Sequence, residues 1–403
     1  MISARKLIIL TIFCTLVSQP ATGDWLTQPS IGGHVKTFNT YYDEPPGTPF
    51  ESGFYSANSQ RLELKGKLAD PVELEIAVDN LLLYSDQPTQ VQLPRTSPNV
   101  RFDLDHDWQR GHEWSDRVVI DRLALHGRHD SFDWAIGRQA IGLGRIVIFS
   151  PLDVVAPFAP DALDTDVRPG VDAARAVRYF GLGGQVGGSV VFGETTENNS
   201  YLLTLSDNRA GIDILGIAGS LRDRELVGGG LAGNLGPLGV KGEISHYHGK
   251  DTELPGGDLH DEFSIGGIEF WYRFDNNVVL IAQYLYNGAG ADKPEDYPLA
   301  ATSAAVREGL TFLLGKHYLL LGPSWEFHPL ATFSGLVIGN LDDDSLLLRP
   351  QLQFSLGDNL SLDLFYSVNL GKEPRQIFPG VSVPRSEFGS AGDNGGLLLR
   401  WYF

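Results

Sequence analysis

The sequence has little of three things that stabilise or identify many other proteins: cysteine, long apolar runs and basic charge. Its one cysteine, Cys14, lies in an apolar segment near the N-terminus. If that segment is removed as a leader, the remaining chain can form no disulfide. Beyond it no stretch of about 18 apolar residues occurs, which excludes transmembrane helices. The 31 basic residues are outnumbered by 50 acidic ones, a net charge of −19 that argues against nucleic-acid binding.

The N-terminus has the three-part pattern of a secretory signal peptide. Two basic residues precede an apolar run over 7–17, which is too short to span a bilayer. Small residues at 21–23 then offer a cleavage site. We therefore expect residues 1–23 to be removed and the mature chain to begin at Asp24.

Alternation of apolar and polar residues is abundant, and it is clearest at the C-terminus. Leu397, Leu399, Trp401 and Phe403 fall on one face of an expected strand, and Arg400 falls on the other. Such a strand suits a barrel wall between lipid and a wet lumen. It resembles the C-terminal signature by which Gram-negative outer-membrane β-barrels are recognised for insertion. The resemblance implies that Trp401 and Phe403 form an assembly signal.

A hairpin turning at Asp70 can be assigned almost residue by residue, because leucines and valines alternate with charges on both of its arms. The expected cross-strand pairs are Lys67 with Glu73, Lys65 with Glu75, and Arg61 with Asp79. Such pairs contribute up to about 1 kcal/mol each. A one-residue slip would turn the charges toward lipid, at roughly 2–4 kcal/mol for Lys or Arg near the midplane. The register is therefore well specified, and we expect these six side chains to face the lumen.

The rest of the chain predicts the same architecture. A second hairpin turns at 357–359 and places apolar residues of 346–356 and 360–370 on one face. Further strands are expected at 34–42, 114–126, 132–139, 173–180, 184–194, 200–206, 212–221, 225–235, 238–248, 262–274, 278–287, 314–326 and 330–340. Long loops are expected at 43–57, 85–113, 140–172, 249–261, 288–313 and 372–394. Short turns alternating with long loops are typical of outer-membrane barrels. We therefore expect an all-β, antiparallel up-and-down transmembrane barrel over 24–403, with about 18 strands and 16 as the alternative.

The segment from Asp133 to Tyr179 is the most distinctive. It contains a Gly-Arg-Gln triplet, spaced glycines, a Pro-Leu-Asp triplet and then several arginines, which resembles a pattern in poorly characterised, porin-like outer-membrane barrels. Its prolines stop regular pairing, and its apolar residues are too many for a loop in water. We expect the loop at 140–172 to fold inward and to narrow the lumen, where facing charges would set ion preference. The expected constriction residues are Arg138, Arg145, Asp153, Asp164, Asp166, Arg168 and Arg175. Loop ion pairs with a purely structural role are the alternative.

Other candidate sites are weaker. His246 and His248 share one strand face, but a strand histidine pair near a loop is more often solvated than metal-bound, so we expect no metal. The Asp342 to Asp344 run lacks the spacing of a calcium loop and is interpreted as a polar hairpin tip. No Gly-x-Ser-x-Gly signature occurs, and we expect neither a catalytic residue nor a cofactor.

The leading hypothesis is a porin-like channel in the bacterial outer membrane for passive passage of small hydrophilic solutes, without enzyme activity. The alternatives are a dedicated conduit, for an anionic polysaccharide or for hydrophobic or aromatic compounds, and a plugged barrel acting as a receptor, adhesin or enzyme. Expected partners are outer-membrane lipid and lipopolysaccharide, the insertion machinery and small solutes, and an oligomer is compatible with this class.

Overall fold

The computed structural model describes residues 26–87, 98–110, 113–378 and 381–403. The expected signal peptide over 1–23 and the expected mature N-terminus at Asp24 lie outside the described residues. Within the described part of the chain, no helix is long and apolar enough to cross a membrane.

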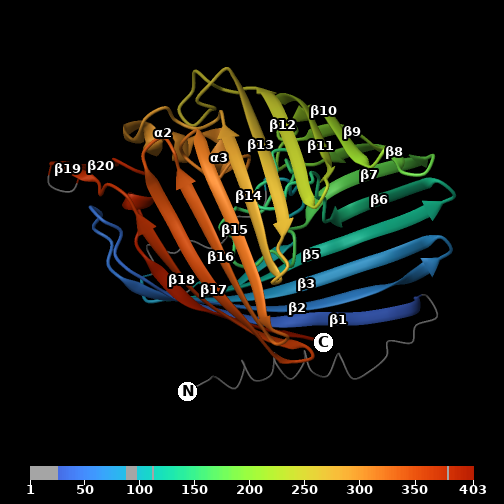
Figure 1. Ribbon diagram of the computed structural model, residues 1–403. Helices are drawn as coiled ribbons and strands as arrows, with labels where there is room; N and C mark the ends of the chain where they lie inside the picture. The colour runs from blue at the N-terminus through green and yellow to red at the C-terminus, as the bar shows by residue number, and fades with distance from the viewer. Residues whose placement is uncertain (1–25, 88–97, 111–112, 379–380) are drawn as a thin grey trace.

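The chain forms one antiparallel sheet that closes into a barrel (Figure 1). Nineteen strands belong to this sheet, and one of them, β4, is a short strand that pairs with β5 alone, which leaves eighteen in the wall. The last strand pairs with the first, from His34 opposite Tyr402 to Tyr42 opposite Asn394. The strands are β1 (Thr27–Tyr42), β2 (Gly53–Ala69), β3 (Val72–Ser85), β4 (Asp105–Arg110), β5 (Trp114–His129), β6 (Phe132–Gln139), β7 (Val171–Phe180), β8 (Gly184–Val191), β9 (Ser200–Arg209), β10 (Ile212–Leu221), β11 (Arg224–Leu235), β12 (Leu238–His248), β13 (Glu262–Arg273), β14 (Val278–Asn287), β15 (His317–His328), β16 (Ala331–Asn340), β17 (Ser345–Gly357), β18 (Leu360–Leu370) and β21 (Asn394–Tyr402). The expected all-β barrel of eighteen strands is confirmed.

The two ends of the barrel differ. At one end, here called the turn end, each hairpin closes in a few residues, as at Asp70–Pro71 between β2 and β3. At the other, the loop end, most connections are long. Gly181 and Gly211 have positive φ angles of 60° and 81° in turns at the turn end, a conformation that glycine adopts without strain. Two connections at the loop end are nevertheless short, at 222–223 and 341–344.

Both hairpins that the alternation specified have the expected register. Arg61 lies opposite Asp79, Lys65 opposite Glu75 and Lys67 opposite Glu73. In the second hairpin, Leu352 lies opposite Leu364 and Phe354 opposite Leu362. Strand β2 begins at Gly53, earlier than alternation indicated, because residues 53–60 show no apolar and polar alternation, with Phe54 and Tyr55 on opposite faces, and pair with β1.

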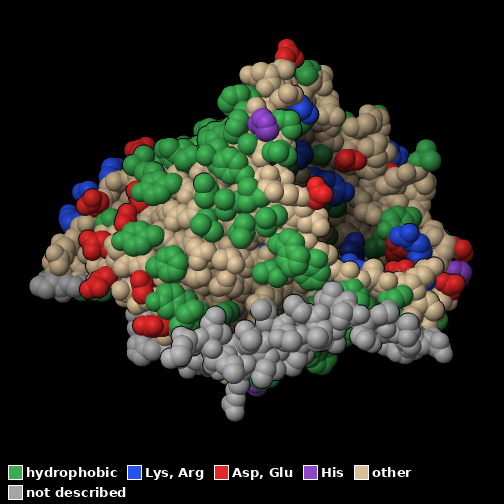
Figure 2. Space-filling view, turned by 90° about the horizontal axis from the view of Figure 1, so that it is seen from below, with side chains coloured by type: hydrophobic (Ala, Val, Ile, Leu, Met, Phe, Trp, Pro, Cys, Tyr) green, Lys and Arg blue, Asp and Glu red, His purple; other side chains and the backbone are tan. Residues whose placement is uncertain are grey.

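The long loops carry the remaining elements. They are η1 (Pro294–Asp296), α2 (Tyr297–Thr302) and α3 (Ala304–Arg307) between β14 and β15, then β19 (Arg375–Phe378), β20 (Val381–Val383) and η2 (Phe388–Ser390) between β18 and β21. The helices lie at the end of the barrel away from the C-terminus (Figure 1). Figure 2, which views the molecule from below, shows hydrophobic side chains spread over the outer wall, as expected for a surface facing lipid.

Part of the lumen is filled by a hydrophobic cluster, here called the dry core. It combines inward residues of every strand from β7 to β17 with apolar residues of the loops at 140–170 and 288–316, and among the described residues it takes none from β1 to β6. Phe149 of the first loop meets Phe312 of the second edge to face, at 6.2 Å between ring centroids. These side chains exclude water from the part of the lumen that they fill.

Candidate functional site

The loop at 140–170 crosses the lumen, and its first half lies against the wall of β12 to β14. Each of these strands presents one polar side chain to the loop backbone. Glu243 accepts hydrogen bonds from the amides of Ile146 (3.1 Å) and Leu152 (3.4 Å), and from the amide of Arg145. Glu269 accepts from Val147 N at 2.7 Å. The loop therefore obtains from wall side chains the hydrogen bonds that a ladder would otherwise supply.

Gln283 of β14 and the hydroxyl of Ser150 complete this first anchor. Gln283 accepts from Phe149 N at 3.1 Å and donates to Phe149 O at 2.7 Å. Ser150 donates to Glu243 at 2.5 Å. All three wall side chains are buried, so their hydrogen bonds are shielded from competition by water.

The second half of the same loop is held by basic side chains of β17, β21 and β1. Arg349 of β17 donates to the carbonyl of Asp161 at 2.5 Å, and Arg400 of β21 donates to the carbonyl of Leu163 at 3.3 Å. Lys36 of β1 forms ion pairs with Asp164 at 2.8 Å and Asp166 at 2.9 Å. The loop is thus fixed to the barrel wall along both of its halves.

A charge cluster on β2, β3 and β5 lies next to this second anchor. The guanidinium of Arg61 is bound to Asp79, to Asp121 at 2.7 Å and to Glu63 at 2.5 Å. Arg122 donates to Asp121 at 2.5 Å. Asp121 and Arg122 are consecutive yet both reach this cluster, because the register between β3 and β5 shifts at this point. A β-bulge of this kind redirects a side chain at the site where it is needed.

Two cavities occupy the open side of the lumen. The upper cavity has a volume of about 360 Å³ and is lined by residues of β1 to β6, of the connection before β4, and of the crossing loop, among them Asp164 and Gly170. The lower cavity, nearer the turn end, has a volume of about 530 Å³ and is lined by β2, β3, β5, β6 and β7. Arg61 of β2 and Arg122 of β5 lie between the two cavities along their strands. Figure 2 shows a hollow, at the right of the view, with charged side chains around its mouth.

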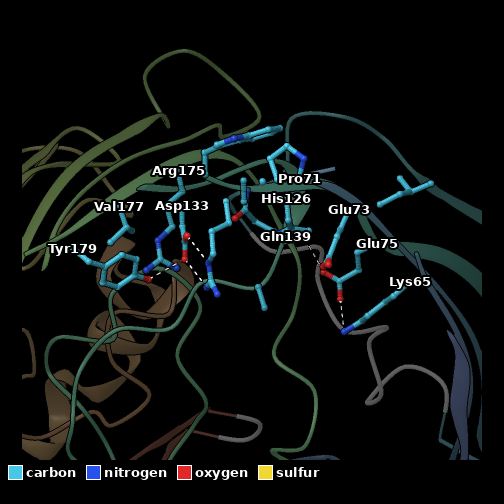
Figure 3. Close-up of a pocket in the computed structure, with 16 residues that line it drawn as sticks. Lys65, Pro71, Glu73, Glu75, His126, Asp133, Gln139, Arg175, Val177 and Tyr179 are labelled. Atoms are coloured by element: carbon cyan, nitrogen blue, oxygen red, sulfur yellow. Dashed lines mark hydrogen bonds and ion pairs between the residues drawn. The ribbon is translucent and has the colours of Figure 1, made fainter. Parts of the chain in front are cut away.

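The lower cavity contains two groups of polar side chains (Figure 3). In one, Glu75 binds Lys65 and His126, each at 3.0 Å. In the other, Asp133 accepts from Arg128 at 2.8 Å and from the Tyr179 hydroxyl at 3.2 Å. Of the expected lumen-facing set, Lys65, Glu73 and Glu75 line this cavity, whereas Asp79 lines the upper one. Lys67 lies 3.5 Å from Asp70, so its ion pair is not with Glu73.

The expected constriction residues are only partly brought together. Arg168 binds Asp153 at 2.6 Å inside the loop. Arg138 instead forms a buried pair with Asp172 at 2.8 Å and does not contact Asp153. Arg145 is exposed, and its guanidinium donates only to the neighbouring carbonyl of Gly144 among the described residues.

Arg175 was expected near Asp153, Asp164 and Asp166, but it lines the lower cavity beside Asp133 and Tyr179. The physical reason is that it lies on β7 two residues before Val177, which pairs with Asp133 of β6 below the loop. The carboxylates of Asp164 and Asp166 have Lys36 and Arg400 as partners instead.

Several residues that hold the site gave no sequence signal of their own. Lys36, Glu243 and Glu269 are charges at inward positions of strands that carry no recognisable motif, and Lys241 shares the face of Glu243 and pairs with Glu269 at 2.8 Å. Glu243 and Glu269 can be located from sequence only by the rule that an inward charge in an apolar strand needs a partner.

A further buried network joins three connections at the loop end. Arg224 binds Asp258 and Glu308, both at 2.6 Å, and Arg222 binds Glu308 at 3.0 Å. Lys250 also reaches Glu308, at 2.5 Å. Burial would raise the pKa of Glu308, but the nearby cations outweigh it and the pKa is lowered.

An acidic network beside α2 is held by hydroxyl and amide groups, and within the described part of the chain no Lys, Arg or His side chain bonds to its carboxylates. Glu387 accepts from Asn340 (2.8 Å), from the Tyr318 hydroxyl and from the amide of Leu314 at 2.9 Å. Burial raises the pKa of Glu387 to about 7. Asp342 to Asp344 lie in the hairpin tip between β16 and β17, as expected, and Asp343 is buried there and accepts from the Tyr297 hydroxyl at 2.8 Å.

Within the described residues, no group of three or more His, Cys, Asp or Glu side chains is arranged to hold a metal ion. His246 and His248 are both exposed. His246 contacts the Ser264 hydroxyl at 2.9 Å, and His248 lies 3.7 Å from Glu262.

No protein-family model matches the sequence, and no curated protein matches it significantly. Solved structures do resemble the fold. A BenF-like porin from Pseudomonas fluorescens Pf-5 superimposes with a TM-score of 0.58 at 11% identity, covering 94% of this chain and 99% of that one. Pseudomonas aeruginosa OpdL gives 0.58 at 12% identity, with coverage of 94% and 99%. OpdK from the same organism, solved with vanillate, gives 0.53 at 10% identity, with coverage of 93% and 98%.

The chain has the fold of an outer-membrane porin. The likeness covers nearly the whole of both chains. At this identity the likeness does not extend to the solute.

Proposed function

We propose that this protein is a channel of the bacterial outer membrane for passive passage of small hydrophilic solutes. The observation that carries the proposal is the pair of cavities on the β1 to β7 side of the lumen, next to a dry core that fills the rest. A solute then follows an off-centre route through the upper cavity, past the level of Arg61 and Arg122, and through the lower cavity. By the convention of outer-membrane barrels, the loop end faces outward and the turn end faces the periplasm.

We assign the narrowest part of the route to the second half of the loop at 140–170, opposite the charge cluster around Arg61. Gly170 donates to Asp121 at 2.7 Å, and Arg122 donates to the carbonyl of Arg168 at 2.6 Å, so the loop reaches the wall there. Charged groups of both signs at this level would act on permeating ions.

A second candidate is a conduit for small aromatic compounds. The upper cavity has apolar side chains beside its charges, among them Leu81, Val119 and Val167. The similar OpdK structure was solved with vanillate, an aromatic compound. This candidate differs from the first in solute preference and not in architecture.

Single-channel recording in planar bilayers tests the proposal. We expect the purified protein to give discrete conductance steps, and a variant lacking residues 146–166 to give larger ones because the lumen loses its crossing loop. Heat-modifiable migration checks that the variant is folded. A folded variant with unchanged conductance would show that the loop is an outer lid, and a folded wild-type protein without conductance would show a plugged barrel.

A further inference from the structure

The upper cavity has an apolar side and a charged side. Leu81 and Val119 come from the barrel wall, Val100 and Leu104 from the connection before β4, and Val167 from the crossing loop. Its volume of about 360 Å³ lies in the range that holds a small organic molecule. An apolar surface of this kind offers little to a bare inorganic ion but would hold the apolar body of an organic solute.

The charged side presents carboxylate oxygen, because the cations lie deeper than their partners. The Lys36 side chain is 5% exposed, whereas Asp164 and Asp166 are 36% and 40% exposed. The same order holds for Arg117 at 14% against Asp105 at 22%, both of which line the cavity. These cations therefore neutralise the carboxylates but are less exposed than the carboxylates are.

The donors on this side are also engaged. Arg138 donates to Asp172 and to the carbonyls of Ile120 and Phe102. Lys36 donates to Asp164 and Asp166. A carboxylate solute would have to displace buried ion pairs, whereas an ammonium group can use the free lone pairs of the exposed carboxylates.

The lower cavity has the reverse order. Arg128 is 74% exposed against 24% for Asp133, and Lys65 is 55% exposed against 18% for Glu75. The acidic character of the upper cavity is therefore local and does not follow from the net charge of the chain.

We propose that the upper cavity is a recognition site for organic cations, in which a single ammonium or guanidinium group contacts Asp164 and Asp105 and an apolar body packs on Leu81, Val119 and Val167. The assignment rests on the proposed channel, because it gives that route a solute class. The site itself is defined by binding and requires no conducting pore.

Two carboxylates of the cavity can be neutralised while every buried cation keeps a carboxylate partner. Lys36 keeps Asp166 when Asp164 is changed, and Arg117 keeps Asp107, at 2.7 Å, when Asp105 is changed. The variant D105N/D164N therefore removes charge from the cavity and leaves each cation a partner. E253Q/E295Q is the matched control, because it removes the same charge from exposed positions of two outer loops that do not line the cavity.

Isothermal titration calorimetry of the detergent-folded protein, with benzylammonium, methylammonium and benzoate as probes, tests the site. We expect benzylammonium to bind more tightly than either other probe, and its affinity to fall about tenfold in D105N/D164N, a loss of about 1.4 kcal/mol, but to stay unchanged in E253Q/E295Q. Benzoate binding as tightly as benzylammonium, or an equal loss in both variants, would overturn the assignment. Binding as expected in a protein without conductance would refute the channel and leave the site standing.

Discussion

Removing the carboxylate of Glu243 should release the first half of the crossing loop from the wall. Glu243 is 4% exposed and accepts from the amides of Arg145, Ile146 and Leu152 and from the Ser150 hydroxyl. In E243A these buried donors lose their acceptor, at about 1–3 kcal/mol for each group left unsatisfied. The Leu152 amide at 3.4 Å is a weak donor, so the other three donors at the low end of this range give a loss of about 3 kcal/mol in the local opening free energy.

Hydrogen exchange followed by mass spectrometry measures this loss. A decrease of about 3 kcal/mol should speed exchange of peptides covering 143–152 on the order of a hundredfold, with the barrel strands unaffected. E262Q, at a position on the exposed side of the neighbouring strand, is the control. If exchange of 143–152 is the same in E243A and wild type, the carboxylate does not anchor the loop and the anchoring argument is wrong.

Three further predictions concern the loop end and barrel closure. Burial raises the pKa of Glu387 from 4.5 to about 7, so protonation of Glu387 stabilises the folded conformation of the loop that carries it. That stabilisation is fully present below pH 4.5 and is lost as the pH rises through about 7. Hydrogen exchange of 381–393, corrected for intrinsic rates, should therefore be faster at pH 8 than at pH 5, and E387Q should abolish the difference. E308A leaves Arg222 without its carboxylate and Arg224 with one fewer, and should cost about 3–5 kcal/mol, seen as proteolysis within 288–316 at a protease concentration that spares the wild type. Deleting Phe403 removes its two backbone hydrogen bonds to Gly33, at 3.0 and 3.1 Å, and should lower the yield of heat-modifiable barrel without changing the conductance of the molecules that fold.

The alternation of apolar and polar residues predicted most of the barrel wall, because one face of each strand faces lipid and the other faces the lumen. The hairpin around Asp70 was specified in register, since a slip would have put Lys65 and Glu75 against lipid. Residues 53–60 were not predicted as strand, because Phe54 and Tyr55 fall on opposite faces and no alternation marks the segment, which pairs with β1.

The crossing loop was predicted from its prolines and apolar residues, but its partners were not. Arg138 was expected to face the loop and instead pairs with Asp172, next to the segment before β4. The anchors Glu243 and Lys36 lie about a hundred residues away from the loop in sequence, at separations of 97 and 128 residues in two of their hydrogen bonds. Sequence periodicity places a side chain on a face but does not say which distant loop folds against it.

Cysteine modification during single-channel recording tests the off-centre route most directly. Ser59 lines the upper cavity, Lys65 lines the lower cavity and Leu285 belongs to the dry core; all three lie in the part of the chain after the expected cleavage, which has no cysteine. We expect a charged, water-soluble thiol reagent to reduce the conductance of S59C and K65C and to leave L285C unchanged. Block through position 285, or full conductance after modification at 59 and 65, would contradict a solute path along β1 to β7.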